Sequence, residues 1–398
     1  MTPRNFTVKE RFSVPYAYPV VFTRGVWGSD NGVLLDVLTR RTPDGQPARV
    51  AVCLDEGLTS AWPGLAHEME RWFESRKGQV ELAAGVQRVP GGERAKNDPR
   101  VVRNLVRSFL RAGLCRHSYV IAIGGGAVLD AVGFAAGLVH RGVRLVRLPS
   151  TTLAQADAGV GVKNGVNFDG VKNAVGMFAP PFAVINDLEW LGTLSDADWM
   201  AGVVEAIKVS VVRDRAFFRR LETLAERLRG RDGQAMELVV RTCAALHLAH
   251  IREGGDPFER GTARPLDFGH WSAHALETIS GYQVGHGQAV AFGIRLDTRY
   301  AQRRGWLPPS PAQAIFDLLD RCGFTDLPPP VRQRLASDAM GLLGGLDRFR
   351  EHLGGRLCVT FPRDIGRVFE TDEVDRRLMA ACLRELLEGM EERAAAGR

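Results

Sequence analysis

The sequence predicts a chain of two domains, an α/β half followed by an all-α half. Its 398 residues exceed what one ordinary hydrophobic core accommodates and suit two domains. In the first half, short apolar runs alternate with helical patterns, which is typical of a parallel sheet covered by helices on both faces. From about residue 195, long helical patterns follow one another and strand signals nearly vanish. We therefore expect one domain at residues 1–190 and a second at residues 191–398.

The spacing of apolar residues predicts each element in turn. Apolar runs rich in β-branched residues predict strands at 50–54, 80–84, 119–124, 143–148 and 182–187. Amphipathic segments between these runs predict helices at 65–76, 99–112 and 127–139. The second half carries further helical patterns at 199–213, 217–228, 235–251, 271–279, 287–304, 311–321 and 373–394.

Arginine dominates the basic residues. The chain has 52 lysines and arginines against 46 acidic residues, a net charge of +6, and only six of the basic residues are lysines. The arginines lie among acids, as on solvated helix faces, so we expect no nucleic-acid partner. No stretch approaches the roughly 20 apolar residues of a membrane span. The N-terminus lacks the apolar stretch of a secretory signal and the six cysteines form no Cys-x-x-Cys pair, so we expect a cytoplasmic protein.

A glycine-rich turn is the first candidate binding motif. The predicted strand at 119–124 runs into Gly124, Gly125 and Gly126, and then into a helix that contains Asp130. Glycines let the backbone approach a phosphate closely, and a helix N-terminus offers free N–H groups. The spacing is not the usual G-x-G-x-x-G, so a tight turn without a ligand is the alternative.

A dense polar segment follows the next predicted strand. Within 24 residues it contains Ser150, Thr151, Asp157, Lys163, Lys172 and Asn173. The glycines between these side chains suggest a loop that folds over a polar, phosphorylated ligand. A flexible polar surface loop is the alternative.

The second half contains a pattern of metal ligands. Glu205 and Lys208 share one face of an apolar helix because they are three residues apart. His270 and His274 are four residues apart on another helix, and His286 follows. One Glu and two His are a common catalytic zinc set that leaves a coordination position open. A single such His would more often be a core or capping residue, but the cluster favours a metal site.

Taken in order, these motifs resemble those of 3-dehydroquinate synthase and its relatives, the sugar phosphate cyclases. The resemblance covers about residues 55–362, including Pro149-Ser-Thr, Glu205-Ala-Ile-Lys208 and Phe268-Gly-His270. It implies a Rossmann-like NAD-binding N-terminal domain, an all-α metal-binding C-terminal domain, a cleft between them and a homodimer.

The resemblance also implies roles for individual residues. Those expected to bind NAD are Asp55, Glu93, Lys96, Gly124, Gly125, Gly126, Asp130, Ser150 and Thr151. Those expected to hold a divalent metal, zinc or alternatively cobalt, are Glu205, His270 and His286. Those expected to act in catalysis are Lys208, His274, Asp157, Lys163 and Asp267. Those expected to bind the substrate are Arg141, Lys172, Asn173, Arg264 and His352.

The sequence departs from dehydroquinate synthases where those enzymes bind a substrate carboxylate. They have Asn in place of Asp267, with an Arg four residues before it, whereas Arg264 lies only three before. They also have a lysine on the preceding helix, where this chain offers His247 or His250. Asp beside a substrate carboxylate is repulsive by on the order of 1 kcal/mol or more, but beside a hydroxymethyl group it accepts a hydrogen bond.

With these departures, the sequence resembles the branch of the family that cyclises sedoheptulose 7-phosphate, a sugar phosphate without a carboxylate. His274 is retained, as in the 2-epi-valiolone synthases. The implied reaction is a transient oxidation by NAD, elimination of phosphate, reduction and an intramolecular aldol closure. The alternatives are a 3-dehydroquinate synthase, a metal-dependent polyol dehydrogenase on the same fold, and an inactive NAD-binding protein.

Overall fold

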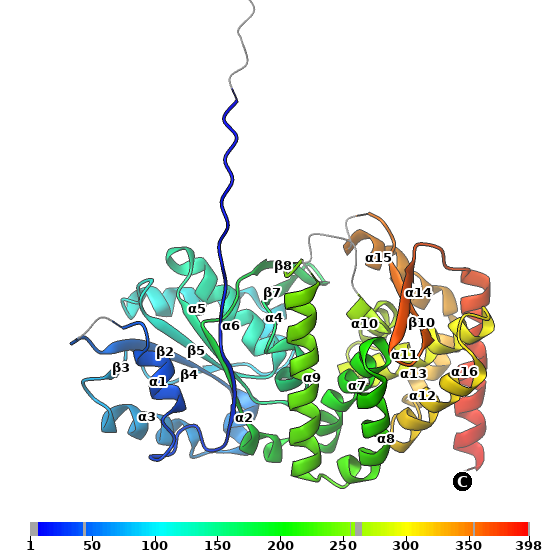
Figure 1. The fold of residues 1–398 in the computed structure, drawn as a ribbon, viewed down its shortest axis with the longest axis horizontal. Helices are drawn as coiled ribbons and strands as arrows, with labels where there is room; N and C mark the ends of the chain where they lie inside the picture. The colour runs from blue at the N-terminus through cyan, green and yellow to red at the C-terminus, as the bar shows by residue number, and fades with distance from the viewer. Residues whose placement is uncertain (1–6, 43–44, 255, 259–264, 353–354, 397–398) are drawn as a thin grey trace, which may run out of the picture.

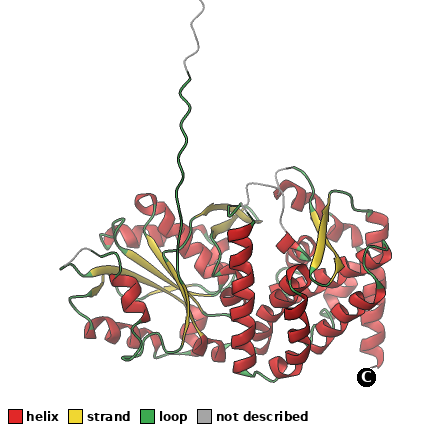
Figure 2. Ribbon diagram, in the orientation of Figure 1, coloured by secondary structure: helices red, strands yellow, loops and turns green. Residues whose placement is uncertain are grey.

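The computed structural model describes residues 7–42, 45–254, 256–258, 265–352 and 355–396. Figure 1 shows a sheet-containing half and a helical half, with α9 (Gly233–Glu253) standing between them. Figure 2 shows that most strands lie in the first half and that helices make up most of the second. The predicted fold class, an α/β domain followed by a helical domain, is confirmed, whereas the boundary between residues 190 and 191 stays a prediction.

The first half is built on a parallel sheet, seven-stranded within the described residues. The strands are β1 (Val20–Thr23), β9 (Ala183–Asp187), β6 (Arg144–Pro149), β5 (Tyr119–Gly124), β2 (Ala48–Asp55) and β3 (Val80–Leu82) in that order, and β4 (Gln87–Val89) also pairs with β2. The central strands β5, β6 and β9 are almost wholly buried. This burial explains why their sequences read as continuous apolar runs.

Two cores lie on the two faces of this sheet. Val50, Val52 and Leu54 of β2 pack with α1 (Val33–Thr39) and α3 (Leu65–Ser75). The alternate β2 residues Ala51 and Cys53 pack with α5 (Pro99–Arg111) and α6 (Gly126–Leu138) on the other face. The two-residue period of the strand therefore divides its side chains between the layers.

The second half packs helices around one large core. Its helices are α7 (Asp196–Arg213), α8 (Arg215–Arg229), α9, α10 (His270–Ile279), α11 (His286–Arg303), α12 (Pro309–Arg321), α13 (Pro329–Ser337), α14 (Ala339–Leu343), α15 (Gly345–His352) and α16 (Arg376–Ala396). The helix α7 is buried at nearly every position from Gly202 to Val212, so it forms the centre of this half. Within the described residues, no helix is long and apolar enough to cross a membrane.

Two hairpins correct the element predictions. The polar segment predicted as a loop forms antiparallel strands β7 (Lys163–Phe168) and β8 (Val171–Phe178). Its strands approach so closely that a Cβ on Gly165 would lie 2.8 Å from the Val175 carbonyl oxygen. A second hairpin, β10 (Val359–Asp364) and β11 (Arg367–Thr371), adds strands to the helical half. Glycines, amides and charges in these strands hide the apolar alternation by which strands are predicted. The short strands β1 and β4 were also not predicted.

Candidate active site

The carboxyl ends of β2, β5 and β6 bring the predicted cofactor-binding residues together. Asp55 ends β2, and its Oδ1 accepts a hydrogen bond of 2.7 Å from the Gly57 N–H. Its Oδ2 faces the Gly125 N–H at 3.4 Å. Burial raises the pKa of Asp55, although these backbone donors oppose the shift. The Ser150 N–H donates to the Gly124 carbonyl at 2.9 Å, so the segment after β6 lies against the glycine turn.

A second group joins α4 (Arg94–Asn97), α6 and the β7–β8 hairpin. Lys96 Nζ lies 2.8 Å from Asp130 Oδ2 and also contacts the side-chain oxygen of Asn173. Lys172 Nζ lies 2.8 Å from Glu277 Oε1 and 3.5 Å from Glu93 Oε1. The structure thus brings five predicted site residues together with Glu277, which was not predicted.

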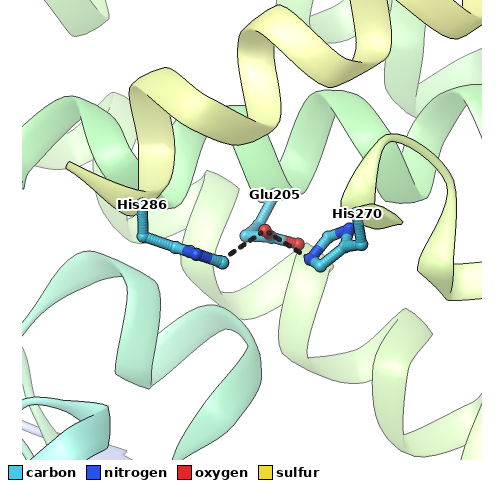
Figure 3. Close-up of side chains that lie close together, drawn as sticks. All are labelled: Glu205, His270 and His286. Atoms are coloured by element: carbon cyan, nitrogen blue, oxygen red, sulfur yellow. Dashed lines mark ion pairs between the residues drawn. The ribbon is translucent and has the colours of Figure 1, made fainter. Parts of the chain in front are cut away.

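The predicted metal ligands converge between three helices. One ligand atom from each of Glu205, His270 and His286 lies within 4.8 Å of the other two. The Glu205 Oε1 is 3.6 Å from His270 Nε2 and 3.7 Å from His286 Nε2, and Figure 3 shows both rings directed toward this carboxylate. These distances are too long for hydrogen bonds and leave a centre that all three groups face.

Close helix packing sets this geometry. A Cβ on Gly287 would lie 2.7 Å from Ala201 Cα, so the start of α11 can rest directly on α7. A Cβ on Gly293 would lie 1.9 Å from the Gly269 carbonyl oxygen, so α11 also touches the start of α10. These approaches place His286 and His270 on either side of Glu205 on α7.

The ligand ring nitrogens have different partners. His270 Nδ1 lies 3.1 Å from the Phe268 carbonyl oxygen. Burial lowers the pKa of His270 well below its ordinary value, and the positive charge of Lys208 adds to the shift. Burial opposes protonation of His286, but the neighbouring carboxylates of Glu205 and Glu277 raise its pKa to about 9.

A chain of charges extends from this cluster. Lys208 Nζ lies 2.5 Å from Glu205 Oε2. Asp157 lies on a π-helical turn at Ala154–Ala158, and its Oδ1 is 2.7 Å from His247 Nδ1. Burial raises the pKa of Asp157, but the charges of His247 and Lys208 outweigh it and bring the pKa below its ordinary value. The sequence left His247 and His250 as alternatives, and it is His247 that pairs with Asp157.

The other predicted residues have different positions. Asp267 ends a 3-10 turn and lies near enough to Lys208 to raise the pKa of that amine. The His274 ring lies 5.6 Å from the His270 ring and 6.3 Å from the His286 ring, between centroids. The residue Lys163 begins β7 and is exposed.

Of the predicted substrate ligands, one lies away from this cluster and two lie outside what the structure describes. Arg141 is exposed and follows α6, at the amino end of the sheet and opposite the glycine turn. Arg264 lies outside the described residues, and so does the side chain of His352, the last residue of α15. The roles expected of these three residues stay predictions.

Two residues of the site region were missed in the sequence. Glu277 faces Lys172 and His286, and its signal was its place three residues after His274 on one helix face. Arg147 is fully buried in β6, and its guanidinium donates to the carbonyl oxygens of Gly161 at 2.9 Å and Lys163 at 2.6 Å. A strand arginine gives no sequence signal that it holds the backbone that follows Asp157.

Family comparisons define the class of this protein. The 3-dehydroquinate synthase N-terminal model matches residues 86–201, and the C-terminal model matches residues 202–340. A 3-dehydroquinate synthase of Pelobacter propionicus is 38% identical over 310 residues, 77% of this chain and 83% of that protein. A 2-epi-valiolone synthase of Actinosynnema mirum is 35% identical over 311 residues, 76% of this chain and 80% of that protein. The chain belongs to the dehydroquinate synthase family of sugar phosphate cyclases.

Solved structures agree with this class. ValA, a 2-epi-5-epi-valiolone synthase from Streptomyces hygroscopicus subsp. jinggangensis with NAD+ and Zn2+ bound, superposes with a TM-score of 0.83 at 26% identity, covering 96% of this chain and 99% of ValA. A 2-deoxy-scyllo-inosose synthase complexed with carbaglucose-6-phosphate, NAD+ and Co2+ shares the fold, with a TM-score of 0.76 at 23% identity over 92% of this chain and 96% of that chain. The protein is therefore an enzyme of the phosphate-eliminating cyclase class.

Proposed function

We propose that the protein cyclises sedoheptulose 7-phosphate to a valiolone-type cyclitol, 2-epi-valiolone, with loss of phosphate. The observation that carries the proposal is Asp267, which stands where dehydroquinate synthases have Asn and adds a negative charge near Lys208. Burial lowers the pKa of this amine, but the negative charges of Glu205, Asp157 and Asp267 raise it above its ordinary value. A substrate carboxylate at this place would meet repulsion of on the order of 1 kcal/mol or more, whereas a hydroxymethyl group could donate to a carboxylate.

The same proposal is supported by the pairing of His247. In dehydroquinate synthases this helix supplies a lysine to the substrate carboxylate. Here His247 Nδ1 lies 2.7 Å from Asp157, so its side chain is already directed to an acid of the chain itself. A 3-dehydroquinate synthase is the second candidate, because a relative with that activity is 38% identical. We further propose a homodimer, as the family resemblance implies.

The turn between β5 and α6 fits a dinucleotide. A Cβ on Gly124 would lie 2.9 Å from the Cβ atoms of Asp55 and Val128, so this turn closes only around glycine. Among the described residues no side chain caps the N-terminus of α6, and its N–H groups can therefore face a phosphate. Asp55, at the end of the neighbouring strand, would accept hydrogen bonds from ribose hydroxyls. We assign NAD+ to this turn.

The Glu205 cluster fits a divalent metal. Both carboxylate oxygens are buried, and neither accepts a hydrogen bond of regular geometry within the described part of the chain. One carboxylate and two imidazoles form a donor set suited to Zn2+, with Co2+ as the alternative. When bound, the metal would polarise a substrate hydroxyl and NAD+ would accept and return a hydride.

The surrounding residues would orient the sugar and move protons. Lys208, kept protonated by its neighbours, would donate a hydrogen bond to a substrate oxygen. Asp157, with its lowered pKa, would accept from a sugar hydroxyl. His274 stands beside both metal ligands and would carry a proton between substrate and solvent. Lys163 and Asn173, on the hairpin, would bind outer oxygens of the sugar phosphate.

Product analysis with the zinc-loaded protein, NAD+ and sedoheptulose 7-phosphate tests this function. We expect one phosphate released per sugar consumed, a C7 cyclitol by mass spectrometry and NMR, and no accumulation of NADH, because the cofactor is restored in each cycle. Accumulating NADH without phosphate release would instead indicate a polyol dehydrogenase. Glu205→Gln serves as the control for activity that depends on the metal.

A further inference from the structure

The carboxylate of Glu277 lies between a predicted metal ligand and the hairpin. Glu277 is 3% exposed and lies on α10, on the same helical face as His270 and His274. Its Oε1 is 3.4 Å from His286 Nδ1 and 2.8 Å from Lys172 Nζ on β8. Its Oε2 is buried and has no hydrogen-bond partner among the residues that the structure describes. A single oxygen thus faces both the histidine and the lysine.

The two ring nitrogens of His286 face two different carboxylates. Nε2 points toward Glu205 Oε1 at 3.7 Å, and Nδ1 points toward Glu277 Oε1 at 3.4 Å. An imidazole that ligates a metal through Nε2 carries its proton on Nδ1, and an acceptor at Nδ1 orients the ring and strengthens it as a ligand. Glu277 occupies the place of that acceptor. His270 differs, because its Nδ1 faces the backbone carbonyl of Phe268.

We propose that Glu277 is a positioning residue that orients the metal ligand His286 and, through Lys172, ties the β7–β8 hairpin to the metal centre. This inference rests on the proposed metal centre. Because one carboxylate serves both partners, metal binding and hairpin docking share an interaction free energy, and that coupling is reciprocal. Zinc binding is therefore expected to slow amide exchange in β8. Loss of Glu277 is expected to weaken both zinc binding and the docking of the hairpin.

The test measures zinc affinity by competition with a chelating indicator, together with hydrogen exchange across residues 163–178. Glu277→Gln keeps the shape of the side chain but removes its charge. We expect its zinc affinity to fall about 10–100-fold, the range for lost carboxylate partners of ligating histidines. We expect exchange in the hairpin to rise, because the amide cannot form the ion pair with Lys172.

Glu93→Gln is the matched control. Glu93 contacts the same Lys172 at 3.5 Å, whereas the carboxylates that face His286 in the described part of the chain are those of Glu205 and Glu277. We expect faster exchange in the hairpin and zinc affinity within about twofold of wild type. Circular dichroism establishes that each variant is folded. Glu277→Asp is a second variant that keeps the charge but withdraws it from His286, and we expect its zinc affinity to be reduced.

The outcomes separate this inference from the proposed function. If the wild type binds no zinc that depends on Glu205, the proposed metal centre is wrong. If the wild type binds zinc and Glu277→Gln binds it equally well, the metal centre stands and the role of Glu277 is overturned. An equal loss of zinc affinity in Glu93→Gln and Glu277→Gln would also overturn it, because the effect would then come from Lys172 alone.

Discussion

The metal-ligand cluster and the β7–β8 hairpin meet at Glu277, but they are built differently. The ligands are carried by α7, α10 and α11. The backbones of these helices are in contact, and buried apolar side chains pack between them. The hairpin is a two-stranded sheet, and most of β8 is exposed. Since long buried helices fix side chains more firmly than an exposed hairpin, the helices should govern chemistry and the hairpin should adjust binding.

Removing the carboxylate of the cluster should have the largest effect. In Glu205→Gln, the metal loses its one anionic ligand, and we expect kcat for phosphate release to fall by at least about 10³-fold with loss of bound zinc. Metal analysis and a phosphate assay measure both. If the variant retained both zinc and full activity, the Glu205 cluster would not be the catalytic metal site.

The helices that carry the metal ligands should also give the protein a distinct pH dependence of stability. Burial raises the pKa of Asp297 to about 7, and its carboxylate accepts from the Gly269 N–H and Trp271 Nε1. Because this folded pKa lies above the unfolded value, stability from this group is complete below about pH 4 and is lost as pH rises through 7.

The variant Asp297→Asn should not lose stability as the pH rises through 7, because its amide does not ionise. We expect the unfolding free energy of the variant relative to wild type to rise by up to about 4 kcal/mol between pH 4 and pH 8. Urea unfolding at several pH values measures it. A difference that is constant with pH would show that Asp297 is ionised at all of them.

Lys208 tests whether an ammonium is needed at this position. Lys208→Arg keeps a positive charge, but the larger planar guanidinium must fit beside Glu205 in a space where Lys208 is 2% exposed. We expect kcat to fall by about 100-fold with little change in zinc content. Near wild-type kcat would show that only the charge matters.

Asp267→Asn tests the assignment of the neutral substrate. We expect kcat/KM for sedoheptulose 7-phosphate to fall about tenfold, because the amide is a weaker acceptor for a hydroxymethyl group. Steady-state assays with equal zinc loading measure this change. Unchanged turnover would mean that Asp267 does not face that end of the sugar.

The hairpin should give the smallest effect. Asn173 has φ +53°, a conformation that Asn tolerates better than Ala, and its side-chain oxygen contacts Lys96. We expect Asn173→Ala to raise KM several-fold and to lower the unfolding free energy by about 1 kcal/mol. A loss of kcat comparable with that of Lys208→Arg would contradict the division between helices and hairpin.

The sequence was most informative where function and regular structure coincide. His270 and His274 lie one turn apart on a helix and His286 follows, so the concentration of histidines indicated a metal site, and the family resemblance selected His270 and His286 as its ligands. The scarcity of lysine was also informative, since Lys96 and Lys208 are both buried in ion pairs and Lys172 lies between two carboxylates. In a chain that otherwise uses arginine, these positions favour the compact ammonium.

The remaining features depend on contacts between segments far apart in the chain. No spacing predicts that Glu277 meets His286 and Lys172, or that His247 meets Asp157 across 90 positions of sequence. Arg147 was hidden for the same reason, because its acceptors are backbone carbonyls beyond the strand. Such partners are set by tertiary packing rather than by local pattern.

The ratio of kcat/KM for sedoheptulose 7-phosphate to that for the carboxylated seven-carbon sugar phosphate used by dehydroquinate synthases tests the central claim most directly. Both substrates are assayed by phosphate release with the same zinc-loaded protein and NAD+. The negative charge of Asp267 near Lys208 predicts a ratio far above one. Phosphate release from the carboxylated sugar alone would contradict the account and identify a 3-dehydroquinate synthase.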